Sequence, residues 1–433
     1  MGLSKLDKAL IKTTGCLPTR IVVAIMTFLG CINLYMVRVN LSVNIVAMVR
    51  QNASQAAEIE GECATNSSGV KEKWELAVSS EDIEEETLKY HHTENIYEDV
   101  QEGELEWNEI IQGVVLASFF YGYTLTQVIG GRLAEKYVTK RVFGICILAG
   151  GFSAILAPIA SRTHFAALIA LRTIQGIFQG VAWPSLHVLI VRWIPPLERG
   201  RFIAIVICAS AISITVTLPL CGLLIDALGW AWAFYIPGAL SLAWCIHWFI
   251  FMHDTPAVHP RISSQEKNYI ETAIRTSGTS EIPPASAPWK KIALSMPVWA
   301  NVVCDIGNAF GFTLCITHIP TYMKNILGFS IKENGLLSAA PFLSRYIGGI
   351  MASTLGDWLL ARQLISIVNN RRLFSAIAMF GPALMVIGVA YSGCNSAAAI
   401  TLLCLTMFFN GSISTSLFVN HCDIAPNFSG KKE

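Results

Sequence analysis

Residues 21–49 read IVVAIMTFLGCINLYMVRVNLSVNIVAMV. One α-helix crosses a bilayer core with about 20 mostly apolar residues, and this run is longer than that and carries a single charge, Arg38. It follows a polar, basic segment and exceeds the apolar core of a cleavable signal peptide, so we expect it to stay in the membrane as an anchor. Nine similar runs follow, at 110–130, 142–160, 164–191, 202–226, 230–252, 296–320, 334–356, 373–391 and 397–420. The sequence therefore predicts an all-α, polytopic membrane protein with about ten transmembrane helices.

Composition narrows the functional class. Apolar residues make up 53% of the chain and charged residues 14%, whereas about a quarter of the residues of a soluble protein are charged. We find no metal-ligand spacing, Walker loop, nucleophile elbow or basic stripe that would bind nucleic acid. We therefore expect no enzyme activity, no cofactor and no metal. Ten spans also exclude a heptahelical receptor, and without a nucleotide site any transport must be driven by an ion gradient or by voltage.

Basic residues mark alternate loops, and such loops face the cytoplasm. They gather in the N-terminal segment, in 132–141, in 192–201 and at Arg371 and Arg372. This alternation of basic and non-basic loops places the N-terminus in the cytoplasm and the acidic loop 50–109 outside. We expect the sequons at Asn52 and Asn66 in that loop to be glycosylated. Cys63 and Cys394 also fall outside and can form a disulfide; two free thiols are the alternative, because spacing does not give connectivity.

Two groups of runs flank a polar stretch that is rich in proline. They divide the chain into an N-terminal six-helix bundle (1–252), a cytoplasmic linker (253–295) and an incomplete C-terminal bundle of four helices (296–433). The second and eighth runs both end in leucine, a small residue and an acid, which indicates an internal duplication. Acids at such exits can receive basic residues and form a latch at the cytoplasmic gate; ordinary basic loops are the alternative. The candidate latch residues are Glu135, Arg141 and Asp357.

Arg38 lies well inside the first run. An arginine at this depth costs at least about 2.5–3.5 kcal/mol on insertion scales. We therefore expect it to face a water-filled cavity or an anion, unless its side chain snorkels toward the outer leaflet.

The fourth run carries a stripe of large polar and aromatic side chains within about a third of the helix circumference. We expect it to line the cavity. His187 could carry a proton or donate to an anion, although a neutral histidine held by a neighbouring helix is the alternative. Gly176 and Gly180 have the GxxxG spacing of close helix approach, and Pro184 should kink the helix just before His187. The members of the stripe are Arg172, Gln175, Gln179, Trp183 and His187.

Polar residues in other runs can complete a site at the midplane. Asn308 lies in the seventh run and Asn420 closes the tenth, near Asp423, for which helix capping is the alternative. Tyr121 follows Phe119 and Phe120 in the second run. It offers a hydroxyl donor to a cavity, and apolar bulk facing lipid is the competing interpretation.

Several motifs resemble the anion and phosphate cotransporter family of the major facilitator superfamily, which includes sialin, the vesicular glutamate transporters and sodium-dependent phosphate transporters. The likeness runs nearly end to end. It is carried by Arg38-Val39-Asn40-Leu41-Ser42, Phe119-Phe120-Tyr121-Gly122-Tyr123, Trp183-Pro184-Ser185-Leu186-His187, Pro195-Pro196-Leu197-Glu198-Arg199, Asp254-Thr255-Pro256, Pro320-Thr321-Tyr322-Met323 and Asn420-His421-Cys422-Asp423-Ile424-Ala425-Pro426.

The resemblance implies alternating access around a cavity between two six-helix bundles, with Arg38 and Arg172 holding the anion and His187 near the coupling site. Gln175, Gln179 and Asn420 are the further cavity or coupling candidates. Sialin-like members have a glutamate where this chain has Gln179, which cannot titrate, so sodium or voltage becomes the preferred driving force. Asn308 replaces an arginine of the glutamate transporters, which argues against a dicarboxylate.

We therefore expect a symporter of inorganic phosphate or an organic anion, with sodium as a possible co-substrate and no nucleic-acid partner. The alternatives are a proton-coupled, sialin-like carrier of acidic sugars or amino acids and a non-transporting form. The family has twelve spans, so the missing last pair suggests a splice variant or an incomplete gene model. An acidic dileucine is absent from residues 1–19, which favours the plasma membrane over lysosomes or secretory vesicles. The oligomeric state stays open.

Overall fold

The computed structural model describes residues 18–50, 103–136, 139–276, 294–327 and 329–417. These residues are helical, and apart from one isolated bridge between Val49 and Leu105 they form no β-structure. The first half comprises α2 (Thr19–Met48), α6 (Glu109–Lys136), α7 (Thr139–Thr163), α8 (Phe165–Gln179), α9 (Ala182–Trp193), α10 (Pro196–Leu228) and α11 (Trp232–Phe251). The second half comprises α14 (Met296–Asn325), α15 (Ile331–Ala361), α16 (Ile367–Tyr391), α17 (Ser396–Asn410) and the short 3-10 helix η3 (Gly411–Ser414).

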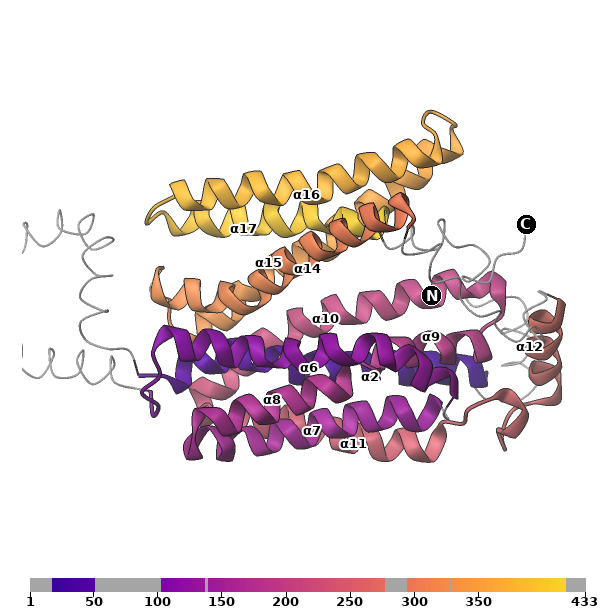
Figure 1. Cartoon of the computed structure of the whole chain (residues 1–433), viewed down its shortest axis with the longest axis horizontal. Helices are drawn as coiled ribbons and strands as arrows, with labels where there is room; N and C mark the ends of the chain where they lie inside the picture. Colours follow the sequence, from indigo (N-terminus) through magenta and orange to yellow (C-terminus); the bar gives the residue numbers. More distant parts are fainter. Residues whose placement is uncertain (1–17, 51–102, 137–138, 277–293, 328, 418–433) are drawn as a thin grey trace, which may run out of the picture.

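Each predicted run coincides with one helix or with a broken helix, so the predicted all-α membrane fold is confirmed. Eight of these segments are long and apolar enough by themselves to cross a membrane. The other two, α6 and α15, run alongside them through the bundle (Figure 1). Several helices extend past the apolar runs; α10, for example, begins at Pro196 because proline suits the first turn of a helix.

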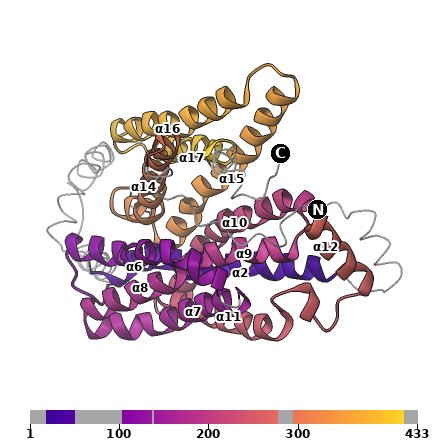
Figure 2. The ribbon, with the colours of Figure 1, turned by 45° about the vertical axis from the view of Figure 1, so that its right-hand side comes forward.

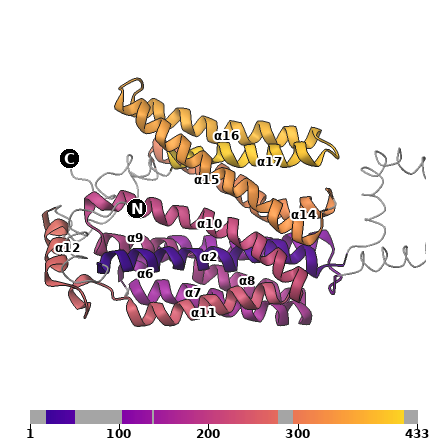
Figure 3. The same cartoon turned by 180° about the vertical axis from the view of Figure 1, so that it is seen from behind.

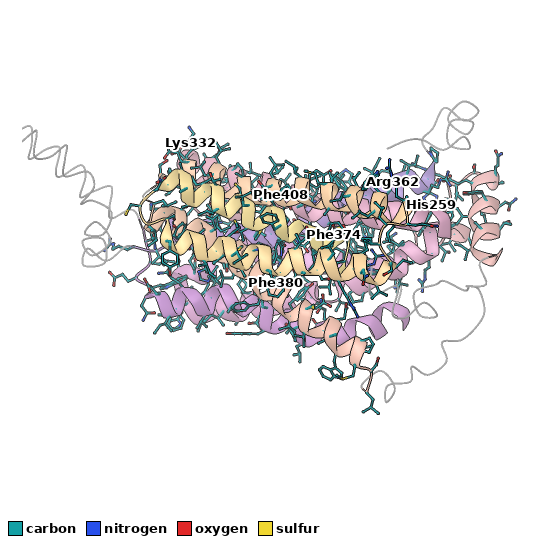
Figure 4. All side chains as sticks on the ribbon, turned by 90° about the horizontal axis from the view of Figure 1, so that it is seen from above. His259, Lys332, Arg362, Phe374, Phe380 and Phe408 are labelled. Carbon is teal, nitrogen blue, oxygen red and sulfur yellow. The ribbon has the colours of Figure 1, made fainter. Side chains whose placement is uncertain are left out.

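The two halves touch at one end of the bundle. We call the end where α2 finishes and α6 begins the loop end, and the end where α11 finishes the linker end. Figure 1 and Figure 3 show the ribbons of α14 and α15 beside the first half at the loop end and diverging from it toward the linker end. In Figure 4, Lys332 and Arg362 mark the two ends of α15, which spans the whole length, and His259 lies near the linker end.

Glycines allow this approach of the halves. A Cβ atom on Gly335 of α15 would lie 2.8 Å from the carbonyl oxygen of Leu218 and 3.0 Å from the Cα of Gly222, both on α10. Nearby, the Lys332 ammonium lies 4.0 Å from the Asp226 carboxylate, where both side chains are exposed. The backbones of α10 and α15 are therefore in direct contact, and the halves are closed against each other at the loop end.

The fourth span is broken, and the break lies earlier than expected. α8 ends at Gln179 and α9 begins at Ala182, whereas Pro184 was predicted to kink the helix just before His187. The displacement has a simple cause: a proline ring clashes with the carbonyl four residues before it, which here belongs to Gly180. Gly176, one turn earlier, packs against the Phe119 carbonyl of α6, so the expected close approach is present.

The linker contains a helix that the sequence reading did not predict. α12 (Ser264–Thr276) lies across the linker end of the first half (Figure 2). Ser263 accepts a hydrogen bond from the Glu266 backbone N–H at 3.1 Å, which caps its start. The Glu266 side chain is 2% exposed and accepts from the backbone N–H groups of Thr19 at 3.0 Å and Arg20 at 2.9 Å. One carboxylate thus joins the linker to the first turn of α2, where such groups lack helical partners.

We predict that Glu266→Ala destabilises the protein by about 1–2 kcal/mol, the range for losing a helix cap and leaving buried N–H groups unpaired. The unfolding temperature of the purified protein in detergent should fall measurably. The matched control is Glu271→Ala on the exposed side of the same helix, which should leave that temperature unchanged. Equal shifts for the two variants would show that α12 itself, rather than the cap, is being tested.

Candidate functional site

Arg172 is clamped onto the backbone of α2. Its guanidinium donates to the carbonyl oxygens of Val37 and Arg38, each at 3.2 Å, and to the side-chain oxygen of Gln175 at 2.9 Å. Gln175 in turn donates to the Val37 carbonyl at 3.1 Å. Arg172 is 4% exposed, and its Nε has no hydrogen-bond partner within the described residues. The bonds of its two terminal nitrogens therefore limit the cost of burying the guanidinium. The first two members of the predicted stripe therefore fasten α8 to α2 beside Arg38.

Arg38 itself is surrounded by aromatic rings. The centroids of Phe119, Phe120 and Tyr123 of α6 lie 4.9, 5.0 and 5.0 Å from its guanidinium carbon, and that of Tyr35 lies at 5.5 Å. A cation within about 6 Å of a ring face is attracted by the ring quadrupole. We call these four rings the aromatic cage. Arg38 stays half-buried, and within the described residues no carboxylate pairs with it.

A second polar cluster lies in the other half. Arg345 of α15 donates through Nε to the side-chain oxygen of Asn410 at 2.8 Å, and Asn410 donates to the side-chain oxygen of Asn308 at 3.0 Å. The guanidinium carbon stands 4.0 Å from the Phe312 ring centroid. The sequence reading selected Asn308 and missed the other two. The sequence did contain a signal for Arg345, because it is the lone arginine inside the apolar run 334–356. The same signal identified Arg38.

The two clusters approach each other where α2 meets α14 and α15. Tyr35 of α2 contacts Arg38 and belongs to the hydrophobic cluster against which Phe312, the ring under Arg345, also packs. Arg172 donates to the backbone carbonyl of Arg38. Arg38 and Arg345 therefore lie near the contact between the halves, with Arg172 buried behind Arg38 in the first half. Within the described residues no carboxylate pairs with any of the three. Such an arrangement suits a small anion with several oxygen atoms.

Comparison with known proteins shows the family to which the chain belongs. The Major Facilitator Superfamily model matches residues 22–431. A "Putative inorganic phosphate cotransporter" of Drosophila melanogaster is 35% identical over 96% of this chain and 74% of its own length. The chain belongs to the anion and phosphate cotransporter family of the major facilitator superfamily. Human sialin is 33% identical over 96% of the chain and 79% of its own length. Vesicular glutamate transporter 1 of Xenopus tropicalis is also 33% identical, over 95% of the chain and 65% of its own length.

Solved structures of distant major facilitator proteins share the fold. An inward-open structure of the xylose transporter XylE from E. coli superposes with a TM-score of 0.59 at 12% identity, covering 92% of this chain and 82% of the transporter. An inward-facing, unoccupied structure of a bacterial homologue of the lysosomal transporter Spinster gives 0.57 at 12% identity, covering 92% and 74%. At such low identity the likeness concerns the fold alone.

Other predicted site residues of this cotransporter family member lie outside the two clusters. Tyr121 is 60% exposed and is absent from the aromatic cage. His187 is exposed on α9, with its Nδ1 2.8 Å from the Trp183 carbonyl oxygen. Gln179 is buried, and neither atom of its side-chain amide has a hydrogen-bond partner within the described residues. Asn420 lies outside the described residues, so its predicted role is untested.

The predicted gating latch stays a prediction, because one of its three side chains lies outside the described residues. Arg141 and Asp357 are both exposed, and within the described residues Asp357 makes no ion pair. The side chain of Glu135 lies outside the described part, as do the sequons at Asn52 and Asn66. Cys394 is disulfide-bonded, but Cys63 lies outside the described residues, so their pairing stays a prediction.

A hydrogen-bonded ion pair secures the loop end. The Arg162 guanidinium donates to both carboxylate oxygens of Glu104, at 3.0 and 3.3 Å, and stacks 4.9 Å from the Trp230 ring centroid. The hydrogen bonds from Arg162 hold the pKa of the Glu104 carboxyl below its ordinary value of 4.5. Glu104 precedes α6, so this pair ties the start of α6 to the end of α7.

The lowered pKa of Glu104 determines how this tie responds to acid. A carboxyl whose pKa is depressed in the folded state stabilises it above the ordinary pKa, and this stabilisation is lost only as the pH falls through the lowered value. We predict that the difference in unfolding temperature between wild type and Glu104→Gln stays constant from about pH 7.5 to 5 and shrinks below about 4.5. Glu106→Gln, at an ion pair of 3.7 Å with an 80% exposed carboxylate, is the control. A difference that vanishes near pH 6 would contradict the pKa assignment.

Proposed function

We propose that this chain is a secondary active transporter of small anions, driven by sodium, with inorganic phosphate as its first candidate substrate. The observation that carries the proposal is that Arg38, Arg172 and Arg345 have no carboxylate partners within the described residues, and that Arg38 and Arg345 lie on helices of opposite halves that contact each other. Uncompensated arginines at this depth are costly, and a bound anion offsets that cost. The anion-transporting relatives support the same class of substrate.

The contact at the loop end supports a proposal of alternating access. With Gly335 and Gly222 in contact there, the anion would enter or leave from the linker end, which we assign to the cytoplasm on the positive-inside pattern of the loops. Separation of α10 from α15, together with closure at the linker end, would then expose the same site to the other side. This rocking of two halves about a fixed site is a general mode of secondary transport.

Sodium coupling is proposed because of Gln179. Its amide is buried and cannot titrate, so a proton would need another carrier. The remaining candidate in the fourth span, His187, is exposed on α9, and its Nδ1 lies beside the Trp183 carbonyl oxygen. Glycosylation at Asn52 and Asn66 and residence in the plasma membrane belong to the same proposal.

The test is uptake of labelled phosphate by cells expressing this chain, with sodium replaced by choline and with surface biotinylation to measure delivery. Uptake that requires sodium supports the proposal. Uptake that persists in choline and rises with external acidity would favour the sialin-like, proton-coupled alternative. No uptake of phosphate or of competing organic anions by protein at the surface would refute transport by this form.

A further inference from the structure

We propose that Arg345, positioned by Asn410 and Asn308, forms an anion-binding subsite of the second half, and that a doubly charged anion binds between it and Arg38. The inference rests on the proposed anion transport and extends it to the charge of the substrate. Sequence reasoning placed the anion-holding charges in the first half alone, and Asn308 argued there against a dicarboxylate. The geometry points to Arg345 as the positive charge that the second half contributes to the site.

The orientation of Arg345 leaves its binding groups free. Nε is occupied by the Asn410 oxygen at 2.8 Å, and one face of the guanidinium lies on Phe312. Within the described residues the two terminal NH₂ groups have no hydrogen-bond partner. A guanidinium fixed through Nε presents its remaining donors as a rigid fork, which matches two oxygen atoms of a phosphate or carboxylate group.

A purely structural role does not require the charge. The hydrogen bonds from Arg345 to Asn410 and from Asn410 to Asn308 tie α15, α17 and α14 together, and a neutral donor such as glutamine can serve that purpose. An arginine at this depth in a membrane is costly, and Arg345 forms no ion pair with a carboxylate within the described residues. An anion is the partner that offsets this cost.

The position of Tyr35 links the two arginines. It contacts Arg38, and it belongs to the hydrophobic cluster against which Phe312, the ring that carries the Arg345 guanidinium, also packs. An anion beside Tyr35 can therefore receive hydrogen bonds from both halves at once. Because each half contributes a cation, a doubly charged anion neutralises both, whereas a singly charged anion leaves one exposed. The predicted preference is for a compact dianion.

The test measures binding to the purified full chain by thermal shift, with sulfate and methanesulfonate as probes. Both have a tetrahedral oxygen-bearing head, but sulfate carries two charges and methanesulfonate one. A ligand that binds the folded state raises the unfolding temperature by an amount that grows with the logarithm of its concentration divided by its Kd, so a titration of each probe gives its affinity. Wild type should bind sulfate at least tenfold more tightly than methanesulfonate, and Arg345→Gln should reduce that ratio to near one. Arg362→Gln, at the exposed end of the same helix, should keep the wild-type ratio.

Other outcomes also decide the matter. Equal binding of the two probes by wild type, or an unchanged ratio in Arg345→Gln, overturns the subsite. If Arg345→Gln does not fold, Arg345→Lys substitutes for it: the charge remains but the fork is lost, so sulfate should stay preferred with several-fold weaker affinity, and a lost preference or wild-type affinity overturns the proposal. Tight sulfate binding by a wild type that takes up no anion would refute transport and leave the subsite standing.

Discussion

Replacing Gly335 by leucine should reduce anion uptake at least tenfold by preventing closure at the loop end. A Cβ atom on Gly335 already comes to 2.8 Å from a carbonyl oxygen and 3.0 Å from a Cα atom of α10. Both are backbone atoms, which cannot rotate aside as a side chain does. A leucine must therefore push α15 away from α10, because tightly packed backbones do not absorb extra methylene groups without moving. The protein should still fold, but in the conformation open at the loop end.

Labelling distinguishes this trapped conformation from misfolding. Ser338 of α15 is fully buried in the closed conformation, so a Ser338→Cys variant should resist an impermeant thiol reagent added from the loop side. In the Gly335→Leu background the same cysteine should react readily. Gly307→Leu is the matched control, since a Cβ there meets no atom within 4 Å, and it should leave uptake and labelling unchanged. Protection of the cysteine in Gly335→Leu would disprove steric opening.

Replacing Arg172 by alanine is expected to abolish measurable uptake. The substitution removes a positive charge beside Arg38 and leaves the Arg38 carbonyl without its donor from α8. A hydrogen bond to a charged group contributes about 1.5–3 kcal/mol, so losing even two of them weakens the support of Arg38 by several kcal/mol. Arg172→Lys should fail almost as badly, because an ammonium cannot reach both carbonyls and Gln175 with the geometry of a guanidinium.

The measurement compares the substrate affinity and the uptake rate of Arg172→Ala with those of wild type, at matched surface expression. Arg192→Ala removes a charge from α9 that contacts Thr139, away from the aromatic cage, and should retain most uptake. If Arg172→Ala kept more than about a tenth of wild-type uptake, the clamp on α2 would be dispensable. If Arg172→Ala reaches the surface and binds phosphate normally but takes it up slowly, Arg172 acts in the conformational change rather than in binding.

Hydropathy was sufficient to predict the spans, because a bilayer requires long apolar runs whatever their neighbours. It could not predict α12, where the capping pattern of Ser263 and Glu266 was present but its partner, the start of α2, lies more than two hundred residues away in sequence. The break at Gly180 was foreseen as a kink near Pro184, and the clash of the proline with the carbonyl four residues earlier explains the shift.

The candidate site was only partly predictable for a similar reason. Arg38 and Arg172 stand out as charges in apolar runs, yet the sequence does not reveal that Arg172 binds backbone carbonyls of α2. The stripe predicted on the fourth span placed Arg172 and His187 on one cavity-lining face. In the structure, the break between α8 and α9 lies between them, and the arginine is buried whereas the histidine is exposed. Arg345 was overlooked because its apolar run was judged by length and exit motif, although a lone charge at its centre carried the same signal.

The aromatic rings around Arg38 also bear on turnover. By occupying the space where water would solvate the guanidinium, the aromatic cage dehydrates this cation when the protein folds rather than each time a substrate arrives. A preorganised, partly dry cation attracts an anion more strongly than a hydrated one and needs less rearrangement of solvent. When the anion binds, it must lose its own hydration water, but Arg38 is already partly dehydrated. The barrier to binding is therefore lower in every cycle.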